Sequence, residues 1–135
     1  MTDVRRIQPP DLVDSRPSGF TQVISTRGEN LIFVSGQVAI DREGRLVGRG
    51  DIGAQTRQVL KNIDVALRAA SASLEDVVKF TIYAVDYKPS DRAKILEARQ
   101  QYFTNERLPA STLVGVQALA ADGYLIEIEA IAVVG

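Results

Sequence analysis

The stretch from Leu108 to Val133 decides the fold: it reads LPASTLVGV, then a connector QALAADG, then YLIEIEAIAV. Both outer segments are rich in the β-branched and aliphatic residues that are typical of strands. The connector ends in Asp122-Gly123, a pair that tolerates positive φ and therefore favours a reversal of the chain. We predict strands at Thr112–Val116 and Tyr124–Val133, lying next to each other in one sheet.

The second of these strands carries two acids in apolar surroundings. Alternation of side chains places Glu127 and Glu129 on the same face, and both faces are otherwise largely apolar, as in a central strand. An ionised carboxylate in such a place is costly unless it has a partner, a water-lined pocket or a subunit boundary beside it. Two interpretations stay open: these acids serve a functional site, or they lie at a solvated rim or in a structural ion pair.

Composition limits the class of protein. A chain of 135 residues is long enough for one domain, residues 1–135, with a substantial core. The formal net charge of −1 gives no general attraction for nucleic acid or for an anionic membrane surface. The apolar runs have the length of strands and the first ten residues lack an apolar signal core, so we expect no membrane partner and a cytoplasmic location.

Two residue types are missing, and their absence limits the chemistry. Without cysteine the chain has no disulfides, thiol nucleophiles or thiolate metal sites. Without histidine it lacks the usual general base near neutral pH and the commonest zinc ligand. Proton transfer would therefore depend on Asp, Glu, Lys, Tyr or a bound water.

The N-terminal third is expected to be extended. Residues 1–19 contain three prolines and Gly19, which favour an extended lead-in over a helix. Strands are predicted at Phe20–Thr26 and Leu31–Ile40. Gly36 interrupts the second of them, which indicates a packing bulge or a close approach by another backbone or by a ligand.

Two helices are predicted. Asp51–Ala70 has apolar residues at the helical period, with Asp51 as its N-cap. After a strand at Val77–Val85, a second helix is expected at Asp91–Phe103, with Ser90 as its N-cap. The order β-β-α-β-α-β-β predicts an α+β fold, a mixed sheet with both helices on one face. The other sheet face is also apolar, so we expect it to be buried between subunits.

Several of these segments together resemble one known family. The run LIFVSGQVAI at 31–40, the long helix, LPASTLVGV and YLIEIEAIAV resemble the RidA family, also called the YjgF or L-PSP endoribonuclease family, from about Gly19 to the end. The resemblance implies a chorismate-mutase-like fold and a homotrimer whose sheets line a central barrel, with clefts between subunits. It also implies hydrolysis of reactive imines or enamines to keto acids and ammonia, without cofactor or metal.

The chain departs from the family pattern at four positions of the implied substrate site. Active relatives have the motif Pro-Ala-Arg, whose arginine clamps the substrate carboxylate, whereas this chain has Ser111 in that position. The family's frequent cysteine corresponds to Leu113, a tyrosine near the start corresponds to Phe20, and an asparagine of the second helix corresponds to Leu96. These four residues are expected to line the substrate site.

Two elements of the family's site are retained. Glu127 matches the acid that is thought to orient or activate the attacking water, so it is the expected catalytic residue, and the backbone at Gly36 is expected to bind substrate. Losing the clamp arginine removes a charged hydrogen bond of about 1.5–3 kcal/mol, so we expect larger or less acidic imines than the typical 2-imino acids. A trimeric ligand-binding or regulatory protein without turnover is the alternative. RNA cleavage fits poorly, because histidine and a basic face are lacking.

Overall fold

The structure is a computed structural model that describes residues 2–104 and 106–135. In chain order its strands and helices are β1 Asp3–Ile7, β2 Val23–Arg27, β3 Asn30–Gln37, α1 Ile52–Ala69, β4 Val77–Val85, α2 Pro89–Gln100, β5 Ala110–Val116 and β6 Ile126–Val134. Short 3-10 turns lie at Arg16–Ser18 and Leu74–Asp76. No helix in the described ranges is both long and apolar enough to cross a membrane.

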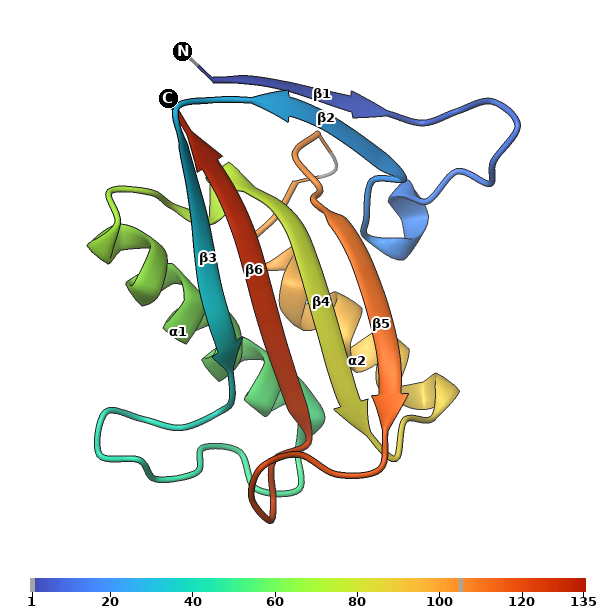
Figure 1. The fold of residues 1–135 in the computed structure, drawn as a ribbon. Helices are drawn as coiled ribbons and strands as arrows, with labels where there is room; N and C mark the ends of the chain where they lie inside the picture. Colours follow the sequence, from blue (N-terminus) through green and yellow to red (C-terminus); the bar gives the residue numbers. More distant parts are fainter. Residues whose placement is uncertain (1, 105) are drawn as a thin grey trace.

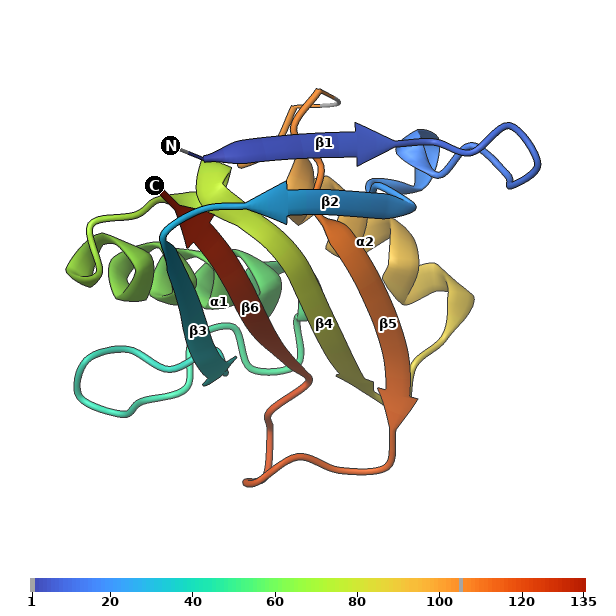
Figure 2. The same cartoon turned by 45° about the horizontal axis from the view of Figure 1, so that its top comes forward.

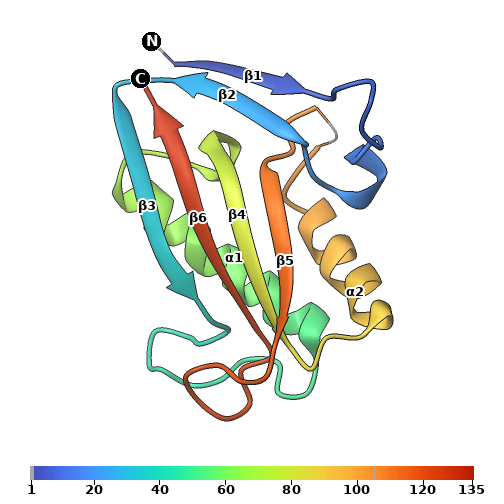
Figure 3. The same cartoon turned by 45° about the vertical axis from the view of Figure 1, so that its right-hand side comes forward.

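The main sheet has four strands in the order β3-β6-β4-β5. β4 and β5 run parallel, while β6 is antiparallel to both β3 and β4. Both helices pack on the same face of this sheet and leave its other face open (Figures 1 and 3). The predicted α+β architecture, a mixed sheet with two helices on one face, is therefore confirmed.

The prediction that the last two strands are neighbours is wrong, because β4 lies between β5 and β6. β4, α2 and β5 form a crossover unit, and a parallel strand pair requires such a connection. The segment after β5 then crosses the end of β4 to start β6 on its far side (Figure 1). Gly123 does adopt positive φ, +86°, but its turn belongs to this crossing loop and not to a hairpin.

The lead-in, residues 1–19, contains a strand that was not predicted. β1 pairs antiparallel with β2, from Asp3 opposite Arg27 to Ile7 opposite Val23, and the pair crosses one end of the main sheet (Figure 2). β1 was missed because its pairing partner lies about twenty residues further along, and its own short run has no clear apolar alternation.

Several predicted boundaries move by a few residues, and two of these shifts have a local cause. β2 begins at Val23 rather than Phe20, because the preceding residues follow β5 instead, with the amide of Thr21 donating to the Pro109 carbonyl at 2.9 Å. α2 begins at Pro89 with Lys88 as its N-cap, so Ser90 lies inside the helix. Proline is favoured at the first helical position because its fixed φ suits the helix and its missing N–H costs nothing there.

The core lies between the helices and the covered face of the sheet. It is dominated by aliphatic side chains of α1, β4 and β6 that are fully buried, among them Val59, Leu60, Ile63, Leu67, Ile82, Ile126 and Ile128. The open face keeps large apolar side chains in contact with solvent: Phe33 is 71% exposed and Leu31 62%. The alternation of β6 thus separates a core face from the face that carries the two acids.

The N-terminal ends of the two helices lead to a prediction about stability. The Asp51 carboxylate accepts a hydrogen bond from the Ala54 amide at 3.0 Å, so Asp51→Ala should lower the free energy of unfolding by about 1 kcal/mol. Ser90→Ala should change it by less than about 0.5 kcal/mol, since Ser90 caps nothing. Urea unfolding followed by circular dichroism measures both variants. Equal losses in the two would contradict the assignment of the caps.

Candidate functional site

The side chain of Glu127 lies directly against the backbone of Gly36. The pairing of β3 with β6 is irregular between Val34 and Gln37. A Cβ atom on Gly36 would lie 2.8 Å from Cδ of Glu127 and would collide with its carboxylate oxygen Oε2. Glycine leaves the place of a side chain to the Glu127 carboxylate, and a larger residue at position 36 would displace this carboxylate. Since β3 is an edge strand, this carboxylate overlies one edge of the sheet.

Glu129, two residues further along β6, has a different environment. It is exposed and accepts a hydrogen bond of 2.8 Å from the hydroxyl of Tyr83 on β4. This hydrogen bond raises the pKa of Tyr83 above its ordinary value, with burial and the charges of Glu129 and Glu127 adding to the effect. In the described part of the chain neither acid forms an ion pair, so the interpretation as a structural ion pair is not supported.

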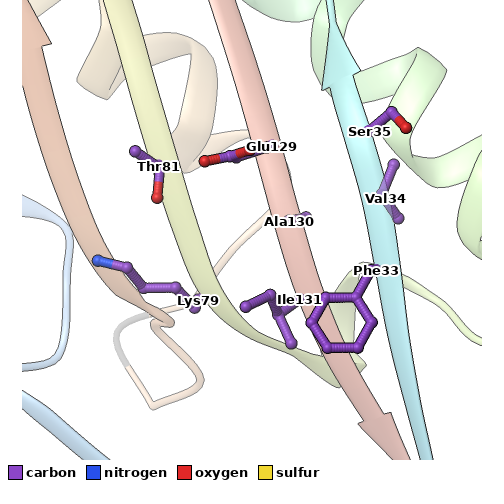
Figure 4. Close-up of a pocket in the computed structure, with 8 residues that line it drawn as sticks. All are labelled: Phe33, Val34, Ser35, Lys79, Thr81, Glu129, Ala130 and Ile131. Atoms are coloured by element: carbon purple, nitrogen blue, oxygen red, sulfur yellow. The ribbon is translucent and has the colours of Figure 1, made fainter.

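A pocket of about 270 Å³ opens on the uncovered face between β3, β6 and β4 (Figure 4). Lys79, Thr81 and Glu129 contribute its polar groups, whereas Phe33 and Ile131 lie side by side and form an apolar wall. Glu129 lines this pocket and Glu127 does not. Tyr83 and Lys79 were not anticipated as members of this surface, although both lie on the polar side of the predicted strand Val77–Val85.

Four of the predicted substrate-binding residues meet in a second cavity, of about 150 Å³, between α2 and β5. Its lining consists of Ser18, Phe20, Arg92, Ile95, Leu96, Arg99, Ser111 and Leu113. We call this space the α2–β5 cavity. It includes Phe20, Leu96, Ser111 and Leu113 but neither Glu127 nor Gly36. In one protomer the six predicted residues therefore form two separate groups.

The two groups lie on opposite faces of the sheet and towards opposite edges. The hydroxyl of Ser111 faces α2, where it accepts from Nη1 of Arg99 at 3.5 Å. Its neighbour Thr112 points to the open face and accepts from Nζ of Lys79 at 2.7 Å. β5 is one edge strand, and β3, which carries Gly36, is the other.

Residues 15–21 fold over the α2–β5 cavity and place Phe20 in its wall. The hydroxyl of Ser15 donates to the Phe20 carbonyl at 2.6 Å, and Thr21 bridges to Ala110 at the start of β5. Gly19 adopts φ of +84°, and a Cβ atom there would collide with the Leu96 side chain. The glycine thus allows the lead-in to lie against α2.

Arg99 was not anticipated as a site residue, yet it is the buried charged group of the α2–β5 cavity. It is only 6% exposed, donates from Nη2 to the Gly19 carbonyl at 3.0 Å, and lies 5.7 Å from the ring centre of Phe80. Burial lowers the pKa of Arg99 to about 10, so the guanidinium stays charged at neutral pH. The sequence did carry a signal, because an arginine occupies the apolar stripe of this helix.

Potential metal ligands do not gather in the described ranges. No group of three or more carboxylates within residues 2–104 and 106–135 is placed to hold a metal ion. The polar groups at hand are the Glu127 carboxylate at the β3 edge and the hydroxyl and guanidinium groups of the α2–β5 cavity. These groups can accept a proton from water and hold an anion, respectively.

Comparison with known proteins confirms the resemblance seen in the sequence. Residues 15–134 match the family model described as endoribonuclease L-PSP. A RutC family protein of Pyrococcus horikoshii is 45% identical over 118 residues, which are 87% of this chain and 89% of that protein. The solved structure of YyfB, a Rid family protein of Yersinia pestis, superposes with a TM-score of 0.88 at 38% identity, covering 97% of this chain and 98% of that one.

Two further relatives carry names that state an activity. The 3-aminoacrylate deaminase RutC of Acinetobacter baylyi is 38% identical over 110 residues, covering 82% of this chain and 84% of that protein. The 2-iminobutanoate/2-iminopropanoate deaminase of Salmonella typhimurium is 36% identical over 106 residues, covering 77% and 80%. The family thus includes deaminases of an enamine and of imines.

The contact between Glu127 and Gly36 can be tested with a double-mutant cycle. Gly36→Ala should lower the free energy of unfolding by about 1–3 kcal/mol, because the added methyl group collides with the carboxylate. In a Glu127→Ala background the same change should cost much less, because the three Glu127 atoms that lie nearest the new methyl, Oε2, Cδ and Cγ, are gone. Chemical denaturation of the four proteins measures the coupling. A cost of Gly36→Ala that does not depend on residue 127 would contradict this packing.

Proposed function

Because the chain belongs to the endoribonuclease L-PSP family, we propose that it hydrolyses reactive imine or enamine intermediates to carbonyl compounds and ammonia. The observation that carries this proposal is the Glu127 carboxylate, which is held over the Gly36 backbone at the sheet edge and forms no ion pair among the described residues. A carboxylate in this state can accept a proton from water.

The active site is completed between protomers of a homotrimer. Glu127 and Gly36 lie at the β3 edge, and the α2–β5 cavity lies at the opposite edge. A ring of identical subunits brings the two opposite edges together, since each contact joins different surfaces of its two partners. The exposed Phe33 and Leu31 support the same arrangement, in which the open sheet faces line a central barrel.

The proposed reaction needs one water molecule and the Glu127 side chain, which acts in turn as a base and as an acid. Glu127 takes a proton from the water as its oxygen bonds to the imine carbon, and the electron pair of the C=N double bond moves to nitrogen. The proton then passes to that nitrogen and gives a carbinolamine. Glu127 next takes the hydroxyl proton as the C=O bond forms and the C–N bond breaks, and it passes this proton to the departing nitrogen, which leaves as ammonia. An enamine enters the same sequence after it gains a proton at carbon and loses one from nitrogen, which gives the imine.

The α2–β5 cavity shapes the choice of substrate. Phe20, Leu96 and Leu113 make it largely apolar, and Ser111 offers a hydroxyl where active relatives have the clamp arginine. The proposed substrates are therefore imines or enamines larger than the typical 2-imino acids, positioned by Ser111 and the Gly36 backbone. RNA is a poor candidate, because the net charge is −1 and histidine is absent.

The two acids of β6 provide a matched test of activity. Imines are generated with an amino-acid oxidase, and keto-acid release is followed with and without the protein. Glu127→Gln should slow the accelerated hydrolysis about 100-fold or more, the usual size of a general-base contribution. Glu129→Gln should retain most of it, because Glu129 bonds to Tyr83 and lies outside the proposed reaction path.

The outcomes separate the enzyme from the alternative of a binding protein. Full activity in Glu127→Gln would overturn the assigned role of this acid. Binding of keto acids or imine analogues to the wild type without turnover of any imine would instead indicate a regulatory or ligand-binding protein.

The trimer makes its own prediction. Light scattering coupled to size exclusion should give a mass about three times 14.7 kDa for the wild type. Phe33→Lys should dissociate the assembly, because it places a charge on the open face that the barrel buries. Val65→Lys, at an equally exposed apolar position on α1, should leave the mass unchanged. A monomeric wild type would refute the shared site.

A further inference from the structure

The α2–β5 cavity holds a positive charge that the described residues leave without a counter-charge. Arg99 is 6% exposed, and its two hydrogen-bond acceptors, the Gly19 carbonyl and the Ser111 hydroxyl, are both neutral. Among the described residues no carboxylate pairs with it, and its Nε atom is buried without a hydrogen-bond partner. A buried charge of this kind is costly unless an anion accompanies it.

A purely structural role accounts for only part of this arrangement. Arg99 does tie the lead-in to α2 through the Gly19 carbonyl, and it packs over the Phe80 ring. A neutral donor would serve that purpose without the cost of burying a charge. The guanidinium has five N–H donors in a planar fork suited to a carboxylate, and the described contacts use two of them.

A second arginine lies on the same face of α2. Arg92 is two helical turns before Arg99, lines the same cavity and donates to the hydroxyl of Ser18. It is exposed, so it marks the mouth of the cavity, whereas Arg99 lies deep in it. Apolar side chains of Phe20, Leu96 and Leu113 line the space beside the two charges.

We infer that Arg99, assisted by Arg92 at the mouth, is an anion-binding group that takes the carboxylate of a small organic acid with an apolar chain. The inference rests on the proposed function for the identity of that acid as an imino or enamino acid. It also explains how Ser111 can occupy the clamp position: the charge now comes from α2 and meets the strand at the Ser111 hydroxyl. The carboxylate of the bound acid must therefore lie deeper in the α2–β5 cavity than it would if the arginine were a residue of β5.

The first experiment measures charge selectivity by calorimetric titration of the full-length protein. The probes are 4-methyl-2-oxopentanoate, a stable keto acid with a longer apolar chain, and its neutral amide, 4-methyl-2-oxopentanamide. The wild type should prefer the acid. Arg99→Met should weaken binding of the acid about ten- to a hundredfold and leave binding of the amide unchanged, because one charged hydrogen-bond partner is lost. Arg99→Lys should recover part of the preference.

Arg68→Gln is the matched control for the loss of an arginine. Arg68 lies on α1, is exposed and pairs with Asp64 at 3.0 Å, so its removal should leave both affinities unchanged. Equal affinity of the wild type for acid and amide, or an Arg99→Met protein that binds the acid as the wild type does, would overturn the inference.

A second variant keeps the test valid if Arg99→Met fails to fold. Ser111→Asp places a carboxylate next to the Arg99 guanidinium, where it supplies the missing anion from within the chain. This variant should lose binding of 4-methyl-2-oxopentanoate. Val65→Asp is its control, because that exposed side chain lies on α1, away from the α2–β5 cavity and the open face, and should leave binding intact. Retained binding in Ser111→Asp would overturn the inference.

The same set of variants distinguishes failure of the inference from failure of the proposed function. Binding of the acid that depends on Arg99, in a protein that accelerates no imine hydrolysis, would refute the deaminase and uphold the anion site. Imine hydrolysis that depends on Glu127 but proceeds equally in Arg99→Met and Ser111→Asp would uphold the deaminase and refute the anion site.

Discussion

The contact between the Glu127 carboxylate and the Gly36 backbone is the constraint on which the candidate site depends. It uses the space that glycine leaves on β3, coincides with the irregular pairing of β3 and β6, and holds an acid over an edge strand. An acid in the middle of a central strand is tolerated because the helices cover only the other face of the sheet (Figure 1). The acid is thereby fixed in position and remains outside the core.

A second unusual charge lies at the other edge of the sheet. Arg99 is buried under the lead-in, and its contacts to Gly19, Ser111 and Phe80 place a cation beside the start of β5. One protomer thus carries the Glu127 carboxylate at one edge of the sheet and the buried Arg99 guanidinium at the other. In the proposed trimer these two charges belong to one site, because a ring of identical subunits brings opposite edges of neighbouring sheets together.

Sequence patterns predicted the larger elements well and the pairing of strands poorly. The apolar period of α1, its Asp51 cap and the alternation of β4 and β6 are local properties, and the structure confirms each of them. The order of strands was predicted wrongly because Asp122-Gly123 favours a turn without specifying which strand follows it in space. β1 escaped prediction because only its distant partner β2 makes it a strand.

The sequence by itself determined the family and the α+β class, because both depend on residue identity and on local periods, and it left open whether Gly36 marks a packing bulge or a close approach. Only the tertiary structure decided that Glu127 and Ser111 lie on opposite faces of the sheet, and that Arg99 lies beside Ser111 as a buried cation. These placements result from how the strands pair and how α2 packs against the sheet. Pairwise contacts of this kind depend on how the layers pack, which no local pattern of residues specifies.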